Sequence, residues 1–257
     1  MPGRFMWYEL MTTDAKVAGG FYRAVVGWKT SEMGGPDNPY TTFHVGDANG
    51  MAGMLTLSAE VQASGARPVW MGYVGVDDVD AYAERLKKAG GAVHQPPADI
   101  PGIGRFSVVA DPGGAAFVLF KGSSPEGPPT GAPGQAGYAG WHELMAGDGA
   151  REFDFYSGLF GWEKTGIHNM GGEMGGYILW TDGRGADAGG LMTKPPFIPV
   201  STWNYYFRVD SVDAAAERIK AAGGAVTNGP MEVPSGDWIV QGTDPQGAAF
   251  ALLGARR

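Results

Sequence analysis

Short runs of apolar or alternating residues, separated by segments of helical length, recur along the whole chain. Phe5–Met11 is apolar and β-prone, and the segment after it has Asp14 as a candidate N-cap and Gly27 as a candidate C-terminal glycine. This pattern predicts a strand followed by a helix through about Val26. The rest of the first half predicts, in order, strands near 40–45 and 51–57, a strand at 69–76, a helix at 79–89, and strands near 92–95, 105–110 and 115–120. The half therefore reads as a β-α-β-β-β unit used twice.

The same pattern returns in the second half at an offset of 133 or 134 residues. The clearest returning segments are Tyr73–Ala81 as Tyr206–Ala214, Asp111–Phe117 as Asp244–Phe250, Trp7–Met11 as Trp141–Met145, Phe21-Tyr22 as Phe155-Tyr156, and Gly27-Trp28 as Gly161-Trp162. Two copies of one fold of about 120 residues, a common size for a single core, are therefore fused. We place the boundaries at residues 1–122, a linker at 123–137, and residues 138–257.

The linker, Ser123–Gly137, is rich in Pro, Gly and Ser and has no apolar periodicity. It predicts an extended, semi-flexible connection. A fainter fourfold repeat places a Trp seven residues before an Asp and twenty before a Gly. Its register is uncertain by one residue, because Asp77-Asp78 and Gly90-Gly91 allow two alignments. That uncertainty matters, since a one-residue slip turns every strand side chain to the other face.

Charge and composition exclude several classes of protein. The net charge is −8, and the sequence has no basic cluster beyond Arg256-Arg257, which argues against nucleic acid or an anionic membrane as partner. The absence of cysteine excludes disulfides and thiolate metal sites. No apolar run has the length of a membrane span. We expect a cytoplasmic protein, monomeric or homodimeric, whose partner is a small molecule.

The paired β-α-β-β-β modules, the Phe-Tyr and Gly-Trp pairs around the first helix of each half, and the closing Asp-Pro-x-Gly strands resemble the vicinal-oxygen-chelate superfamily. This superfamily includes glyoxalase I, extradiol dioxygenases and bleomycin-resistance proteins. The chain is most similar to its tandem two-domain actinobacterial members, described as 27 kDa antigens or "hydroxylases". The resemblance implies an α+β fold in which each half forms a curved, eight-stranded mixed sheet, a cup with the ligand on its concave face.

The resemblance also implies a divalent metal, held by His, Glu or Gln on the first strand of each module and on the closing strand. A first-strand ligand would stand seven residues before the helix cap, and the closing ligand seven residues after the Asp of Asp-Pro-x-Gly. Those positions hold Trp7, Met71 and Val118 in the first half and Trp141, Asn204 and Ala251 in the second. None is a plausible ligand for a hard or borderline cation. We therefore expect no metal and no cofactor in either half.

The face that would carry the metal supplies the candidate ligand-binding residues: Trp7, Glu9, Met71, Tyr73, Arg105, Trp141, Glu143, Asn204, Tyr206 and Arg208. Glu9 and Glu143 either contact a ligand or are satisfied by an Arg, a Tyr or a backbone N–H. Trp7 and Trp141 either form an aromatic wall or fill the cup. Catalytic residues are not identifiable.

The strand near 203–209 has two distinct faces. Trp203, Tyr205, Phe207 and Val209 should lie against a helix, whereas the face of Asn204, Tyr206 and Arg208 should line something wet. Arg208 suits a carboxylate or phenolate ligand and equally a salt bridge to Glu143. Four histidines, His44, His94, His142 and His168, show no metal spacing, and His142 should point towards a helix. Tyr22 and Tyr156 are expected to pack against the sheet.

Three functions remain open. The leading hypothesis is metal-independent binding of a small aromatic or amphipathic molecule in one or both cups. The alternative is a glyoxalase-, dioxygenase- or hydroxylase-type enzyme that uses Glu9, Glu143 and a histidine as non-standard ligands. The third is an interaction protein whose cups are filled by its own side chains. Met71 and Gly75 predict a more apolar first cup, and Asn204 and Arg208 a more polar second one.

Overall fold

The computed structural model describes residues 3–35, 39–48, 50–124, 131–132, 134–171 and 175–256. The first half contains β1 (Arg4–Thr12), α1 (Ala15–Val26), β2 (Lys29–Met33), β3 (Tyr40–His44), β4 (Ala52–Thr56), α2 (Ala59–Ala63), β5 (Val69–Gly75), α3 (Val79–Lys88), β6 (Ala92–Ile100), β7 (Gly104–Ala110) and β8 (Ala116–Gly122). The second contains β9 (Ala139–Ala146), α4 (Gly149–Phe160), β10 (Glu163–Asn169), β11 (Gly176–Thr181), β12 (Gly189–Thr193), β13 (Thr202–Ser211), α5 (Val212–Ala221), β14 (Ala225–Glu232), β15 (Trp238–Thr243) and β16 (Ala249–Ala255).

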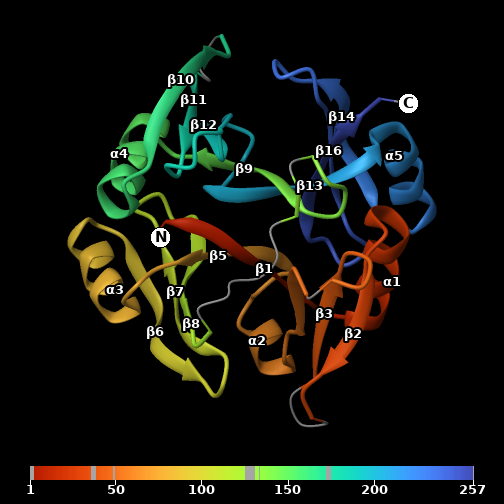
Figure 1. The fold of residues 1–257 in the computed structure, drawn as a ribbon, viewed down its shortest axis with the longest axis horizontal. Coiled ribbons are helices and arrows are strands. Elements are labelled where there is room, and N and C mark those ends of the chain that lie inside the picture. Colours follow the sequence, from red (N-terminus) through yellow and green to blue (C-terminus); the bar gives the residue numbers. More distant parts are fainter. Residues whose placement is uncertain are drawn as a thin grey trace. The chain divides into compact units, whose positions relative to one another are not determined.

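These strands form two eight-stranded mixed sheets with the same topology (Figure 1). The strand orders are β2-β3-β4-β1-β5-β8-β7-β6 and β10-β11-β12-β9-β13-β16-β15-β14. In each module the first strand pairs in parallel with the last, as β1 does with β4 and β13 with β16, and the others form antiparallel hairpins. The α+β fold of four β-α-β-β-β modules is confirmed.

The structure differs from the sequence-based expectation at two edges of the first sheet. β2 was not predicted, because its residues are almost all exposed and show no apolar face. β6 runs to Ile100, past Pro96 and Pro97, whereas the pattern predicted an end near Gln95. Its pairing with β7 shifts register between Gln95 and Ala98. An edge strand with a bulge tolerates prolines, because their missing N–H groups are not needed there.

The helix caps settle the register of the fourfold repeat. The side chains of Asp14, Asp78, Asp148 and Ser211 accept hydrogen bonds from backbone N–H groups in the first turns of their helices. In the second and fourth modules the cap therefore stands one residue later than the Trp-to-Asp spacing suggested. Counting back seven residues from each cap leads to Trp7, Met71, Trp141 and Asn204, the positions expected for the first-strand ligands.

The chain packs into two compact units, each taking one module from each sequence half. The α3/α4 unit comprises Met1–Met6, Gly72–Gly127 and Trp141–Asn204, and the α1/α5 unit comprises Trp7–Met71, Pro128–Gly140 and Tyr205–Arg257. In the first unit α3 lies beside α4, and in the second α1 lies beside α5 (Figure 1). Arg85 on α3 donates to the carbonyl oxygens of Gly158 and Leu159 at the end of α4, and Arg218 on α5 donates to that of Val25 on α1.

The faces of β13 follow the prediction in part. Trp203, Tyr205, Phe207 and Val209 are buried, as expected. Asn204 and Arg208 are partly exposed, but Tyr206 is only 2% exposed. It is covered because the amide of Gln241 on the neighbouring β15 donates to the Tyr206 hydroxyl at 2.7 Å.

The expected linker falls largely on residues 125–130 and 133, outside the described part of the chain, so its extended character stays a prediction. β8 ends at Gly122 and β9 begins at Ala139, which leaves the proposed domain boundaries as a matter of sequence. Among the described residues, no helix has the length and apolarity needed to cross a membrane.

Candidate functional site

A hydrogen-bonded trio of side chains, the first Trp–Tyr–Glu triad, lies on β1 and β3 in the α1/α5 unit. The Trp7 indole Nε1–H donates to the Tyr40 hydroxyl at 3.2 Å, and that hydroxyl donates to Glu9 Oε2 at 3.0 Å. Trp7 and Glu9 are two residues apart on one strand and reach the same hydroxyl, so they share a face as predicted. Glu9 is 7% exposed.

The α3/α4 unit contains a second Trp–Tyr–Glu triad on β9 and β11. Trp141 Nε1–H donates to the Tyr177 hydroxyl at 2.8 Å, and Tyr177 donates to Glu143 Oε1 at 3.1 Å. Glu143 is also 7% exposed. The same three residue types thus make the same two bonds in each unit, so the arrangement belongs to the repeated module and not to one copy.

A glycine makes room for the tyrosine in each triad. Gly53 on β4 pairs with Glu9 in parallel register, and Gly190 on β12 pairs likewise with Glu143. A Cβ at Gly53 would overlap the Tyr40 ring and hydroxyl, and one at Gly190 would overlap Tyr177. The tyrosine therefore lies across the glycine to reach the carboxylate on the next strand.

Burial fixes the direction of the hydrogen bonds. Burial first, and then the charge of Glu9, raises the pKa of Tyr40 well above its usual value, and Tyr177 is raised in the same way beside Glu143. Both hydroxyls therefore stay protonated and keep donating to the carboxylates. Each triad presents an oriented indole beside an oriented carboxylate, which suits contact with a flat ring bearing a hydrogen-bond donor.

The surroundings of the two triads differ. Thr42 on β3 pairs with Gly53, and Leu179 on β11 occupies the matching place opposite Gly190. Thr42 Oγ1 lies 2.8 Å from His44 Nε2, and His44 Nδ1 lies 3.0 Å from the Ala48 carbonyl oxygen. A Cβ at Gly50 would stand within 3.7 Å of Trp7, Thr42 and His44 alike. The first triad therefore has polar neighbours where the second has leucine.

The residues at the family's metal positions do not fit a metal. The Trp7 and Trp141 indole nitrogens each carry a hydrogen that is donated to a tyrosine, so neither offers a lone pair. Ala251 pairs with both Tyr206 and Gln241, which bond to each other across it. In the part of the chain that the structure describes, no three His, Cys, Asp or Glu side chains lie close enough together to hold a metal ion.

The candidates on the second strands are placed less tightly. Met71 and Tyr73 are buried, at 6% and 7% exposure, and Tyr73 packs edge-on to Phe120. Arg208 lies 3.8 Å from Asp237, an acidic partner other than the Glu143 that the sequence suggested. Ligand contact by these residues, and by Asn204 and Tyr206, stays a prediction.

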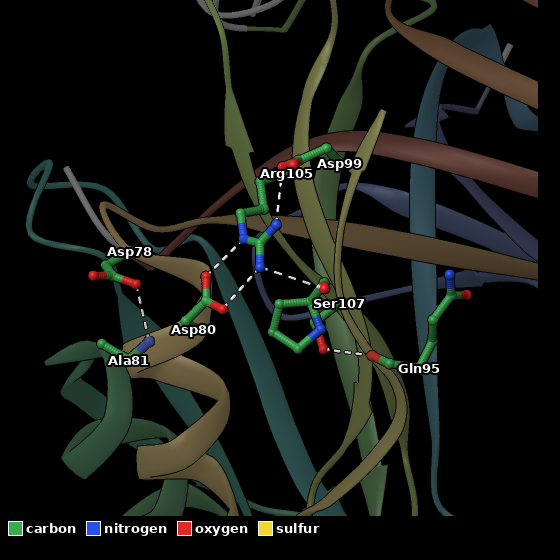
Figure 2. A network of polar contacts seen from close by, with 8 residues as sticks. Asp78, Asp80, Ala81, Gln95, Asp99, Arg105 and Ser107 are labelled. Atoms are coloured by element: carbon green, nitrogen blue, oxygen red, sulfur yellow. Dashed lines mark hydrogen bonds and ion pairs between the residues drawn. The ribbon is translucent and has the colours of Figure 1, made fainter. Parts of the chain in front are cut away.

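Arg105 on β7 is engaged in an ion-pair network (Figure 2). Its Nε and Nη2 donate to the two oxygens of Asp80 on α3 at 2.6 and 2.8 Å, and Nη1 donates to Asp99 on β6 at 2.9 Å. Figure 2 also shows Asp78 capping α3 at Ala81. Arg105 thus ties α3 to the hairpin of β6 and β7, and its place among the ligand-binding residues stays a prediction.

His142 packs in the interior, as its position beside Trp141 suggested. Its ring stacks on Phe5 with centroids 4.5 Å apart, and Nδ1 lies 2.7 Å from the carbonyl oxygen of Ala188. Loss of water contact lowers the pKa of His142 to about 4, so the ring is neutral at physiological pH and Nδ1 is the donor.

The tyrosines of the repeated Phe-Tyr pairs do more than pack. In the α1/α5 unit, Trp70 Nε1–H donates to the Tyr22 hydroxyl at 2.8 Å, and Tyr22 donates to Asp244 at 3.2 Å. In the α3/α4 unit, Trp203 donates to Tyr156 and Tyr156 to Asp111, both at 3.0 Å. We call these buried sets the Trp–Tyr–Asp triads. The aspartates are those of Asp-Pro-x-Gly.

Sequence reasoning missed Tyr40 and Tyr177 in the candidate sites. Their spacing is 137 residues, because the second half has a longer connection between its helix and this strand, so the 133 and 134 offsets did not align them. The signal that would have found them is a strand Tyr opposite a Gly in the Met-Ala-Gly-Met and Ala-Gly-Gly-Leu segments.

Comparison with known proteins agrees with this architecture. Mycobacterium bovis and Mycobacterium tuberculosis proteins provisionally named glyoxylase CFP32 are 34% identical over 258 residues, covering 96% of this chain and 93% of theirs. The anthracycline biosynthesis protein DnrV of Streptomyces peucetius is 30% identical over 274 residues, covering 99% and 94%.

Solved structures with a similar fold include the Mn(II)-bound glyoxalase of Novosphingobium aromaticivorans, with a TM-score of 0.67, 16% identity and coverage of 98% of this chain and 82% of that one. The 2,3-dioxygenase LapB of Pseudomonas sp. KL28 has a TM-score of 0.66, 14% identity and coverage of 99% and 92%. One family model matches both halves, at residues 4–119 and 138–252. The chain therefore belongs, in each of its two halves, to the glyoxalase/bleomycin resistance protein/dioxygenase superfamily.

Proposed function

We propose that this protein binds a small aromatic or amphipathic molecule, without a metal, at one or both Trp–Tyr–Glu triads. The observation that carries the proposal is the replacement of the family's first-strand metal ligand by a tryptophan in both halves. In each case the indole is bonded to a tyrosine that also holds a glutamate. A metal-binding position has become an aromatic and carboxylate surface.

The chemistry of the triads favours a flat ring that carries hydroxyl or amino groups. The bonded indole keeps one orientation, so stacking on it costs little side-chain entropy. The carboxylate accepts a hydrogen bond from the ligand in a site of low water access. The name of the DnrV relative refers to anthracyclines, which are polycyclic aromatic molecules with phenolic groups, and this ligand class agrees with the triad chemistry.

The two triads should not bind one ligand equally well. On the strands that carry them, the first has Thr42 and His44 where the second has Leu179. The second strands pointed the other way, with Met71 in the first half and Asn204 in the second. We expect the triad surroundings to decide hydrogen bonding, so that a polyphenol prefers Trp7 and an unsubstituted ring system prefers Trp141. We further expect a cytoplasmic monomer or homodimer.

The test is titration of EDTA-treated protein with 1,2-dihydroxyanthraquinone, followed by tryptophan fluorescence and calorimetry. We expect saturable binding, weakened at least tenfold by Trp7→Ala or by Glu9→Gln, with Trp238→Phe as the matched control. Trp238 is a partly exposed tryptophan on β15 that lies against Arg256. Binding that appears only after Mn²⁺ is added, or that survives substitution of both Trp7 and Trp141, would contradict the proposal.

A second candidate function is an enzyme of glyoxalase, dioxygenase or hydroxylase type. The fixed carboxylates of Glu9 and Glu143, together with the glyoxylase name of the mycobacterial relatives, favour it. Its test is turnover of the hemithioacetal of methylglyoxal, or of catechol with O₂, by protein supplied with Mn²⁺ or Fe²⁺. Turnover abolished by Glu9→Gln or Glu143→Gln would establish the enzyme; turnover indifferent to both would dismiss these carboxylates as its ligands.

A further inference from the structure

Two buried carboxyl groups meet in the α3/α4 unit, away from the residues of its Trp–Tyr–Glu triad. Glu152 on α4 and Asp111, at the turn between β7 and β8, are each 2% exposed. A Cβ on Gly113 would stand 3.0 Å from Glu152 Oε1, 3.4 Å from Asp111 Oδ1 and 2.9 Å from Ser201 Oγ. The two carboxyl groups thus lie on either side of the bare Gly113 backbone.

The hydrogen bonds of the two groups are unequal. Asp111 accepts from the Ala115 N–H at 2.8 Å and from the Tyr156 hydroxyl at 3.0 Å. Glu152 Oε2 is buried and has no hydrogen-bond partner among the described residues. Donors stabilise a carboxylate, and an unbonded buried oxygen destabilises one. A single negative charge therefore belongs on Asp111, and a proton belongs on Glu152.

We propose that Glu152 and Asp111 form a proton-binding site in which one proton is held on Glu152, and that this site makes the stability of the α3/α4 unit depend on pH near neutrality. Two carboxylates in one dry place cannot both ionise without cost, so the pair keeps a proton that an exposed glutamate would lose.

The matching place in the α1/α5 unit supports a specific role. By the repeat, Glu152 corresponds to Ala18, and Gly113 corresponds to Gln246. The two positions have exchanged size: one unit has a long acid on the helix and a glycine in the turn, the other a small residue on the helix and a long amide in the turn. The fold accepts a neutral arrangement here, so the acidic one is a property of the α3/α4 unit alone.

The charges around Glu152 leave the direction unchanged. Burial first, then Asp111, raises the pKa of Glu152 to about 7, with Asp148 adding to the rise and Arg151 opposing it. Burial also raises the pKa of Asp111. From the neighbouring elements, Arg85 on α3 bonds to the carbonyls at the far end of α4, and Lys164 on β10 lies over the Phe153 ring.

The sign of the pH effect follows from the raised pKa. In the unfolded chain Glu152 would lose its proton near pH 4.5, and in the folded protein it does so near 7. Between these values the folded state holds a proton that the unfolded state has released, so stability falls as pH rises. The contribution is complete below about pH 4.5 and is lost above about 7.

The experiment is thermal unfolding of the full chain from pH 5.5 to 8.5, with ¹³C NMR of glutamate carboxyl groups in the wild-type protein. We expect one glutamate to titrate near pH 7 and the melting temperature to fall by about 3–5 °C between pH 6 and 8. Glu152→Gln should remove that fall, whereas Glu84→Gln, an exposed glutamate on α3 paired with Lys87, should keep it.

A paired variant guards against a folding defect. Glu152→Ala combined with Gly113→Gln copies the arrangement of the α1/α5 unit, and removing Glu152 clears one of the atoms that a side chain at position 113 would meet. It should fold and show the flattened pH profile. The proposal is overturned if every glutamate in the wild type titrates below about pH 5.5, or if Glu152→Gln and the paired variant keep the wild-type pH slope.

Discussion

Each Trp–Tyr–Asp triad joins three side chains whose polar atoms are deep in the core. Tyr22 and Tyr156 have 0% exposure, so a hydroxyl without partners there would cost about 1–3 kcal/mol. The repeat marked all the members, since each recurs at the same offset. Which of them meet was beyond the sequence, because Asp111 bonds to Tyr156 of the other half and Asp244 bonds to Tyr22. That pairing depends on which modules pack together.

Tyr22→Phe should destabilise the protein by about 1–3 kcal/mol, because it leaves the Trp70 N–H and one oxygen of Asp244 unpaired. The measurement is the urea unfolding midpoint. Tyr82→Phe is the control, since the Tyr82 side chain is also buried but its hydroxyl makes no hydrogen bond within the described part of the chain. Equal losses for the two variants would mean that the triad adds nothing beyond packing.

The helices begin where their caps place them, and the caps decided the point that the sequence left open. Asp77 and Asp78 were equivalent candidates by pattern, and only the hydrogen bond from Ala81 N to Asp78 Oδ1 at 2.9 Å separates them. The elements with an apolar face were predicted well. β2 and the outer part of β6 were not, because edge strands without a buried face carry no periodic signal.

Removing the cap of α3 tests the register at the level of the element. Asp78→Ala should cost about 1 kcal/mol, since the first-turn N–H groups lose their acceptor. Asp77→Ala, one residue away and exposed, should change the urea midpoint little. A larger loss for Asp77→Ala than for Asp78→Ala would return the register to the other alignment and move the inferred first-strand position from Met71 to Trp70.

At the scale of the whole molecule, the sequence halves and the compact units are different divisions of the chain. Each sheet is built from one half, whereas each compact unit contains one module from each half. The repeat predicted the two sheets but not the units, because sequence similarity shows which modules are alike and not which pack against one another. The Trp–Tyr–Asp triads record the packing, since each takes its Tyr and its Asp from different halves.

An isolated first half, residues 1–122, would therefore lose the partners of two buried groups. Asp111 would lack Tyr156, and Tyr22 would lack Asp244. Since Tyr22 is the counterpart of Tyr156, and Asp111 of Asp244, two copies of this half can restore both bonds by pairing with each other. We expect residues 1–122 to sediment as a homodimer in analytical ultracentrifugation, at twice the mass of the half.

The Tyr22→Phe substitution gives this expectation its control. In the isolated half it removes the hydroxyl that would bond to Asp111 of the second copy, so it should raise the dissociation constant about tenfold, the equivalent of about 1.4 kcal/mol. In the full-length chain the same substitution should weaken stability without changing the mass. A stable monomer of residues 1–122 would show that a half folds without a partner, and that the cross-half triads add stability to domains that are already complete.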